Sequence, residues 1–202
     1  MTAGLGRFLV VEGIDGCGKS TQAARIAERL GAVLTFEMGA TRLGAQVREL
    51  VLGHEGEPSE MAEALLIAAD RAQHVAEVIE PALRQGIDVV SDRFAASTLA
   101  YQGWGRGLAL EDLVILVELA TAGCRPDLTL LFDLDVEAAA ARRGGEPDRM
   151  EREQAEFHER VRAGYLAQAA AEPDRWAIVD ASRSLDEVSA AVDEILVSHG
   201  WG

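Results

Sequence analysis

Short apolar runs alternate with longer amphipathic stretches along the whole chain. The runs lack the polar alternation of half-exposed strands, so they predict strands that are covered on both faces. They occupy residues 8–11, 32–36, 87–91, 127–133 and 176–179.

The stretches between the runs carry apolar residues at helical spacing. We expect Pro81 to kink the longest of these helices. The alternation of strands and helices predicts an α/β fold, a five-stranded parallel sheet with helices on both faces. The length of 202 residues predicts a single domain over residues 1–202. The expected helices are residues 20–30, 41–52, 60–85, 110–122, 136–143, 154–171 and 185–197.

The chain is acidic, and its net charge excludes some classes of binding partner. Lys and Arg number 19 and Asp and Glu 34, which gives a net charge of −15. Such a surface repels phosphate backbones, so we expect no nucleic-acid binding and no attachment to anionic membranes. No apolar run reaches the roughly 20 residues of a membrane span. Cys17 and Cys124 are too few for a disulfide framework, which fits a cytoplasmic location.

A glycine-rich turn joins the first predicted strand to the first predicted helix. The glycines let backbone N–H groups turn inward around phosphates, at the positive end of the helix dipole. Lys19 supplies charge for the β- and γ-phosphates, and the Ser20 hydroxyl is a ligand for Mg²⁺. We therefore expect ATP and Mg²⁺ to bind here. The turn reads Gly13-Ile14-Asp15-Gly16-Cys17-Gly18-Lys19-Ser20 and matches the phosphate-binding pattern G-x-x-x-x-G-K-[ST] at every fixed position.

Lys19 is the only lysine of the chain, and the other 18 basic residues are arginines. A composition that otherwise uses arginine keeps a lysine where a compact ammonium group fits the phosphate cradle better than a guanidinium group. Regulatory GTPases read guanine with an Asn-Lys-x-Asp segment, which needs a second lysine. Because Lys19 is the only one, this class is excluded. The Leu-Ser-Gly-Gly-Gln segment of ATP-binding-cassette proteins is absent as well. Small-molecule kinases remain.

Residues suited to a phosphate acceptor lie farther along the chain. Asp92 and Arg93 follow the third predicted strand, at the sheet edge where ligands of α/β proteins bind. Arg93 can grip a phosphate with two N–H groups, and Asp92 can contact the waters of Mg²⁺; a surface ion pair is the alternative. Tyr101 and Gln102 offer an aromatic face and an amide that can read a base edge, or else a buried anchor for a loop.

Two further groups of charged residues have two interpretations each. Asp70 and Arg71 interrupt an apolar helix and mark either the boundary of its buried face or a site. Arg142, Arg143 and Arg149 gather in a segment rich in glycine, proline and charge. We expect this segment to be a short mobile lid, about residues 136–152, whose arginines close over the transferred phosphoryl group. A solvated helix end is the alternative.

Four segments together resemble the thymidylate kinases, the nucleoside-monophosphate kinases that phosphorylate dTMP. The resemblance covers nearly the whole chain in order. It implies transfer of the ATP γ-phosphoryl group to dTMP, giving dTDP and ADP for dTTP synthesis. It also implies a cytoplasmic homodimer, which the long apolar helix would suit. The segments are Phe8 to Thr21, Ala69-Asp70-Arg71 with His74, Ser91 to Phe94 followed by Ser97 to Gly107 (the Asp-Arg-aromatic and Tyr-Gln-Gly stretches), and Asp133 to Val136 with Asp148 to Tyr165.

The resemblance implies roles at matching positions. On the ATP side, residues 13–21, from Gly13 to Thr21, would bind ATP, with Lys19 catalytic and Ser20 on the metal. Asp92 would support the metal. The lid arginines Arg142 and Arg143 would meet the ATP phosphates, and Arg149 would be catalytic.

On the acceptor side, Asp15 would contact the dTMP sugar or metal-linked waters, and Arg93 would hold the dTMP phosphate. Arg71 would lie beside thymine. Thr98 and Gln102 would read the base edge, and Tyr101 would wall off the deoxyribose.

Two parts of the chain depart from the family pattern. Phe36 stands where the family often has an arginine, and Met38 where it often has a proline. Ile67 stands where an aromatic side chain often stacks on the base, so we expect weaker stacking and less thymine-over-uracil selectivity. Two other functions stay open: a small P-loop kinase with another acceptor, or a nucleotide-binding regulatory protein that transfers no phosphoryl group.

Overall fold

The computed structural model describes residues 4–53, 58–144 and 148–201. Within these ranges five parallel strands form one sheet in the order β2-β3-β1-β4-β5. Each predicted strand overlaps an observed one, and the predicted fold class is confirmed. The strands are β1 (Phe8–Glu12), β2 (Val33–Phe36), β3 (Val89–Asp92), β4 (Leu128–Asp133) and β5 (Trp176–Asp180).

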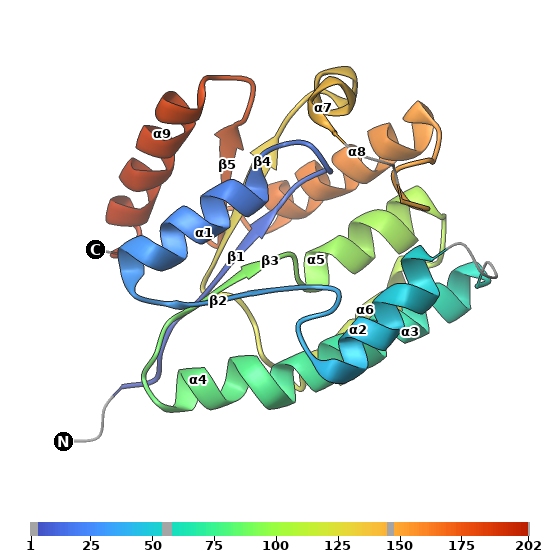
Figure 1. Cartoon of the computed structure of the whole chain (residues 1–202), viewed down its shortest axis with the longest axis horizontal. Coiled ribbons are helices and arrows are strands. Elements are labelled where there is room, and N and C mark those ends of the chain that lie inside the picture. The colour runs from blue at the N-terminus through green and yellow to red at the C-terminus, as the bar shows by residue number, and fades with distance from the viewer. Residues whose placement is uncertain (1–3, 54–57, 145–147, 202) are drawn as a thin grey trace.

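Helices cover both faces of the sheet (Figure 1). On one side lie α1 and α9, and on the other lie α8 and the rod formed by α3, η1 and α4. Among the described residues, every helix is too short or too polar to span a bilayer. The helices are α1 (Lys19–Leu30), α2 (Arg42–Leu52), α3 (Glu60–His74), η1 (Val75–Ile79), α4 (Glu80–Arg84), α5 (Ala95–Thr98), η2 (Leu99–Gly105), α6 (Leu110–Thr121), α7 (Val136–Arg142), α8 (Ala155–Ala171) and α9 (Leu185–Ser198).

Strand β1 is the centre of the core. All five of its residues are buried, and successive side chains point to opposite faces. Leu9 and Val11 pack in the cluster that contains Ile26 of α1, whereas Phe8 and Val10 pack in the cluster that contains Ile79. Because β1 lies between β3 and β4, the residues that follow β1 and β3 meet at the carboxyl edge of the sheet.

The long helix predicted over residues 60–85 is divided. It begins as α3, widens into the π-helical turn η1 and continues as α4, with Pro81 in the first turn of α4. Proline has no N–H for the preceding turn, and its ring needs room beside the carbonyl four residues earlier. The wider turn, in which the Glu80 N–H reaches the Val75 carbonyl, gives that room. The helix therefore runs on past Pro81 in place of a sharp kink.

The segment after β3 is helical and not a loop. It forms α5 and the π-helical turn η2, which packs against α8. Its glycines serve close packing: a Cβ at Gly103 would lie 2.5 Å from Leu110 Cδ2, and one at Gly105 would lie 2.6 Å from Phe157 Cε2. Tyr101 and Gln102 thus lie on a rigid, buried π-helical turn. Turns of this kind frequently occur at functional sites.

Candidate active site

The glycine-rich turn forms an open cradle between β1 and α1. Its three glycines at positions 13, 16 and 18 have φ values of 145°, 93° and 90°, a region that side chains disfavour. A Cβ at Gly16 would also lie 2.3 Å from the carbonyl oxygen of Ala139 in α7. Helix α1 starts directly at Lys19 after a glycine, so the N–H groups of its first turn face the cradle without a side-chain cap. This backbone suits bound phosphate.

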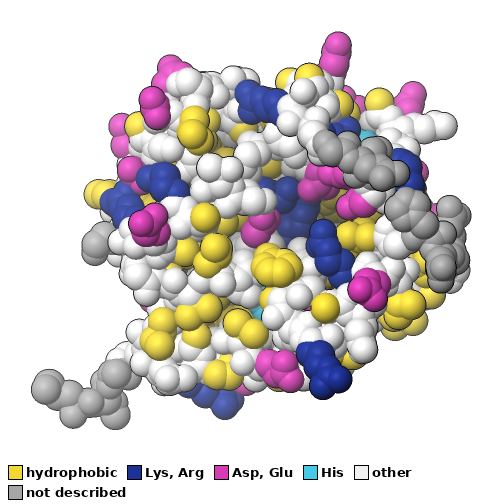
Figure 2. All heavy atoms as spheres, viewed as in Figure 1, with side chains coloured by type: hydrophobic (Ala, Val, Ile, Leu, Met, Phe, Trp, Pro, Cys, Tyr) yellow, Lys and Arg dark blue, Asp and Glu magenta, His cyan; other side chains and the backbone are white. Residues whose placement is uncertain are grey.

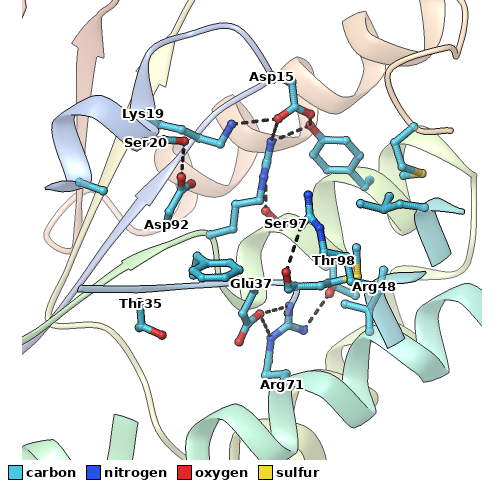
Figure 3. A pocket seen from close by; sticks show the side chains of 18 of the residues that line it. Asp15, Lys19, Ser20, Thr35, Glu37, Arg48, Arg71, Asp92, Ser97 and Thr98 are labelled. Carbon is cyan, nitrogen blue, oxygen red and sulfur yellow. Dashed lines mark hydrogen bonds and ion pairs between the residues drawn. The ribbon is translucent and has the colours of Figure 1, made fainter. Parts of the chain in front are cut away.

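Asp15 connects the cradle to the rest of the site (Figure 3). Its carboxylate accepts hydrogen bonds from Lys19 Nζ at 3.0 Å, from Arg93 Nη2 at 2.7 Å and from the Tyr101 hydroxyl at 3.0 Å. Burial raises the pKa of Asp15, but Arg93 and Lys19 together outweigh it and hold that pKa well below its usual range. Asp15 is therefore ionised, and two cations, Lys19 and Arg93, are hydrogen-bonded directly to it.

Arg93 has an unusual backbone. Its φ is 72°, in the left-handed region that non-glycine residues rarely adopt and that is found at functional sites. The guanidinium group donates to Ser97 Oγ at 3.1 Å, to the Tyr165 hydroxyl at 2.9 Å and to the Tyr101 hydroxyl at 3.1 Å. Together with Asp15 of the glycine-rich turn, these partners on α5, α8 and η2 fix the direction of the guanidinium group.

Glu12 lies under Arg93 and was missed as a site residue by sequence reasoning. Its buried carboxylate accepts hydrogen bonds from the Phe94 N–H at 2.9 Å, from Ser97 Oγ at 2.7 Å and from the Tyr165 hydroxyl at 2.9 Å. Burial raises the pKa of Glu12, although Arg93 at 4.0 Å opposes the shift. The signal for Glu12 in the sequence was its place as a charged residue directly after four apolar residues.

Arg71 is held by a second buried network. It donates from Nε to Glu37 at 2.9 Å, from Nη1 to Thr98 Oγ1 at 2.8 Å and from Nη2 to the Phe94 carbonyl at 3.1 Å. The Nδ1 atom of His74 is hydrogen-bonded to the other carboxylate oxygen of Glu37, Oε1, at 3.0 Å. Arg71 lines a cavity beside the cradle, and its role there stays a prediction.

Asp70, its neighbour, points elsewhere. It lies against the backbone N–H of Gly39, and burial raises the pKa of its carboxyl group.

A cavity of about 610 Å³ lies between these networks, within the range of small-molecule sites. Figure 2 shows the hollow with basic and acidic side chains gathered in it. The departing residues Phe36 and Ile67 both line it, and the ring of Phe36 is 47% exposed. Arg48, Glu37 and Met150 line it too, and sequence reasoning had not assigned them. Lining residues predicted from sequence are Asp15, Lys19, Ser20, Arg71, Asp92, Arg93, Thr98, Tyr101 and Gln102.

Comparison with known proteins is consistent with this geometry. Residues 11–192 match the sequence family described as thymidylate kinase. A thymidylate kinase of Cupriavidus metallidurans is 50% identical over 199 residues, which cover 96% of this chain and 98% of the relative. The chain belongs to the thymidylate kinase family. Members of this family are ATP-dependent phosphotransferases that convert dTMP to dTDP, so the predicted family and enzyme class are confirmed.

Other relatives agree. A thymidylate kinase of Neisseria gonorrhoeae is 48% identical over 200 residues, covering 96% of this chain and 97% of the relative. The crystal structure of thymidylate kinase from Ehrlichia chaffeensis superimposes with a TM-score of 0.78 at 32% identity, covering 95% of this chain and 98% of that one.

The residues expected to hold Mg²⁺ in this family member lie together. The Ser20 hydroxyl donates a hydrogen bond to Asp92 Oδ2. Among the described residues, Asp92 Oδ1 is buried without a hydrogen-bond partner. Oxygen donors of this kind fit Mg²⁺, which usually takes one or two protein ligands and completes its shell with water and phosphate. No group of three or more His, Cys, Asp or Glu side chains in the described ranges is placed to hold a metal ion.

The three predicted lid arginines do not converge. Arg143 lies beside the cradle, with its Cγ 3.1 Å from a Cβ placed on Gly16. Arg142 donates instead to the Ala181 carbonyl at 2.8 Å. Arg149 donates to the Val51 carbonyl at 2.7 Å and to Glu63. Residues 145–147 of the expected lid lie outside the described residues.

Cys17 lies two residues before α1, and a helix N-terminus favours the thiolate form of a nearby cysteine. The side chain is buried, and burial raises the pKa of the thiol although Lys19 opposes the shift. The structure therefore favours a small packing residue over a reactive thiolate.

Proposed function

We propose that this chain transfers the γ-phosphoryl group of ATP to dTMP in the cavity at the carboxyl edge of the sheet. One observation carries the placement: Asp15 binds Lys19 of the phosphate cradle and Arg93 of the opposite wall at the same time. A donor phosphate on Lys19 and an acceptor phosphate on Arg93 would face one another there.

On the donor side, residues 13–21 hold the ATP phosphates, with Lys19 on the β- and γ-phosphates. Ser20 and Asp92 hold Mg²⁺, which supplies charge neutralisation and alignment of the phosphates. Arg143 is the lid arginine nearest the cradle, and Arg142 and Arg149 require a rearrangement of the 136–152 lid to reach it.

On the acceptor side, Arg93 holds the phosphate of dTMP and Tyr101 bounds the deoxyribose. Arg71, Thr98 and Gln102 address the base. The acceptor oxygen belongs to a phosphate that is already ionised at neutral pH, so no general base is needed. Catalysis consists of alignment and charge neutralisation.

The test is ADP release by the purified protein with Mg-ATP and a panel of acceptors: dTMP, dUMP, dCMP, AMP, GMP and thymidine. We expect dTMP to exceed all others. If another acceptor leads, the assignments on the base side are wrong. If ATP binds and no acceptor is turned over, the chain is a nucleotide-binding protein without transfer.

We further propose a homodimer through α3 and α6. These helices pack against each other, and each exposes large apolar side chains. Sedimentation should give a dimer, and Leu119→Glu, at the most exposed of these positions, should give a monomer. The exposed residues are Met61 and Leu65 of α3 and Leu110, Val114, Ile115 and Leu119 of α6. A cytoplasmic location accords with Cys17 and Cys124, which are both unpaired thiols.

A further inference from the structure

Glu63 is a buried carboxylate that the proposed roles leave unused. It lies in the first turn of α3 and is 0% exposed. Gln102 Nε2 donates to its Oε1 at 2.7 Å. Arg149 and Arg106 bind its other oxygen, the latter at 3.5 Å from Nη2. Glu63 therefore touches a residue that lines the cavity without lining the cavity itself.

The contact with Glu63 fixes which end of the Gln102 amide faces Glu63 and which end faces away. An ionised carboxylate has no hydrogen to donate, so Gln102 must turn its NH₂ group toward Glu63. The amide is planar, and its Oε1 is consequently turned away from Glu63. Gln102 is 1% exposed, and the flipped amide would bring two acceptor oxygens together in a buried place. The flipped form is therefore excluded.

We propose that Glu63 is a positioning residue that makes Gln102 present a hydrogen-bond acceptor to the base, and that this polarity selects pyrimidines with an N–H at position 3. Thymine and uracil carry that N–H, whereas cytosine has a bare acceptor nitrogen there. A cytosine would face the Gln102 oxygen with a second acceptor and leave both unpaired. The inference rests on the proposed function, in which Gln102 reads the base.

Glu63→Gln tests the polarity. A glutamine at position 63 can offer either its oxygen or its NH₂ group, so Gln102 becomes able to turn either way. We expect the ratio of kcat/KM for dTMP to kcat/KM for dCMP to fall about tenfold or more, the size of one hydrogen bond exchanged for an unpaired buried group. Arg106→Gln is the control, because it removes a cation from Glu63 and leaves the acceptor-only carboxylate; its ratio should match that of the native chain.

A swap of the two side chains sharpens the test. Gln102→Glu alone sets two carboxylates against each other and should raise KM for dTMP strongly. In the double variant Glu63→Gln with Gln102→Glu, an NH₂ group at position 63 again faces a carboxylate, whose second oxygen still accepts from N3–H. We expect the double variant to recover the dTMP preference to within a few-fold. Since the double variant keeps one carboxylate in this buried pair, it carries the test even where Glu63→Gln alone does not fold.

Three results would overturn the inference. One is a Glu63→Gln protein that slows with every acceptor by the same factor, since a merely structural role predicts that outcome. Another is a folded double variant without the dTMP preference. A third is an unchanged ratio in Gln102→Ala, which would show that Gln102 does not read the base. The third result also removes the base-side assignment while leaving dTMP turnover in place, so it is distinguishable from failure of the proposed function.

Discussion

Asp15 and Arg93 join the ends of two neighbouring strands through a contact of 2.7 Å between Oδ1 and Nη2. Asp15 follows β1, Arg93 follows β3, and the register pairs Val11 with Asp92. The left-handed backbone of Arg93 turns its side chain toward the cradle. The cation of the acceptor wall is therefore in position before any substrate arrives, which reduces the reorganisation that binding requires.

Arg93→Lys should raise KM for dTMP by about ten- to hundredfold. Lysine keeps the charge but cannot donate in the planar fork that reaches Asp15, Ser97 and both tyrosines. Charge-assisted hydrogen bonds to phosphate are worth about 1.5–3 kcal/mol each, which sets the expected range. Steady-state kinetics at saturating ATP measure it.

Arg84→Lys is the matched control for that substitution. Arg84 forms an exposed pair with Glu80 on α4, far from the cavity lining. Exposed pairs contribute little, so its KM should stay at the native value. Equal kinetics for the two variants would show that Arg93 holds no acceptor phosphate.

Local patterns predicted most of the fold. Strands such as β1 and β4 are continuous apolar runs, and both faces of the sheet are covered, so the pattern and the burial agree. The two π-helical turns were not predictable in the same way. Residues 99–105 contain two glycines, Gly103 and Gly105, whose packing partners Leu110 and Phe157 lie on other helices. Only the packed structure shows that these residues continue a helix.

The candidate site, like the fold, was predictable from the sequence only in part. The cradle is one contiguous segment, so its spacing alone predicts it. Glu12, Glu37 and Glu63 are single carboxylates whose roles come from partners 34 to 153 residues away. A carboxylate in a sequence gives no sign of which cation or amide it will meet. The lid arginines show the converse: adjacent Arg142 and Arg143 point to different places.

Lys19→Ala should lower kcat by about two orders of magnitude or more, because the compact charge on the transferred group is lost. The fold should survive, since Asp15 keeps Arg93 as a partner. As the chain has one lysine, a sample labelled with ¹⁵N at lysine Nζ should give a single side-chain signal that shifts with Mg-ATP. A folded variant with near-native turnover, or a signal indifferent to ATP, contradicts the role of Lys19.

Gly16→Ala should destabilise the chain more than Gly18→Ala. Both positions have φ near 90°, so both substitutions carry the left-handed strain of about 1–2 kcal/mol. Only Gly16 adds a collision, with the Ala139 carbonyl, whereas a Cβ at Gly18 meets nothing within 4 Å. For a chain of this size each kcal/mol lowers Tm by about 2–4 °C. Scanning calorimetry of the pair measures the difference, and equal Tm values would show that α7 does not pack on the cradle in solution.

Glu12→Gln should change how stability depends on pH. Burial raises the pKa of Glu12 in the folded chain, so the folded state binds this proton more tightly than the unfolded state does. The stability that this difference contributes is present below the ordinary glutamate pKa of about 4.3 and is lost as pH rises through the folded pKa. Glutamine does not titrate, and its amide can still accept from the Phe94 N–H while it donates to the Ser97 and Tyr165 hydroxyls.

The free energy of unfolding of Glu12→Gln relative to the native chain should therefore increase from pH 4 upward and level off once Glu12 is ionised in both states. Urea titrations at intervals of half a pH unit give this difference directly. Asp180→Asn is the control, because the pKa of that exposed carboxyl is lowered by Ser182 and Arg183, so the native Asp180 gains stability above its ordinary pKa. From pH 4 upward the Glu12→Gln difference should rise, whereas the Asp180→Asn difference should stay nearly flat, because its change lies below the ordinary aspartate pKa of about 3.9. Parallel curves would mean that Arg93 offsets burial at Glu12 and that the carboxylate under the active site is as easily ionised as one in water.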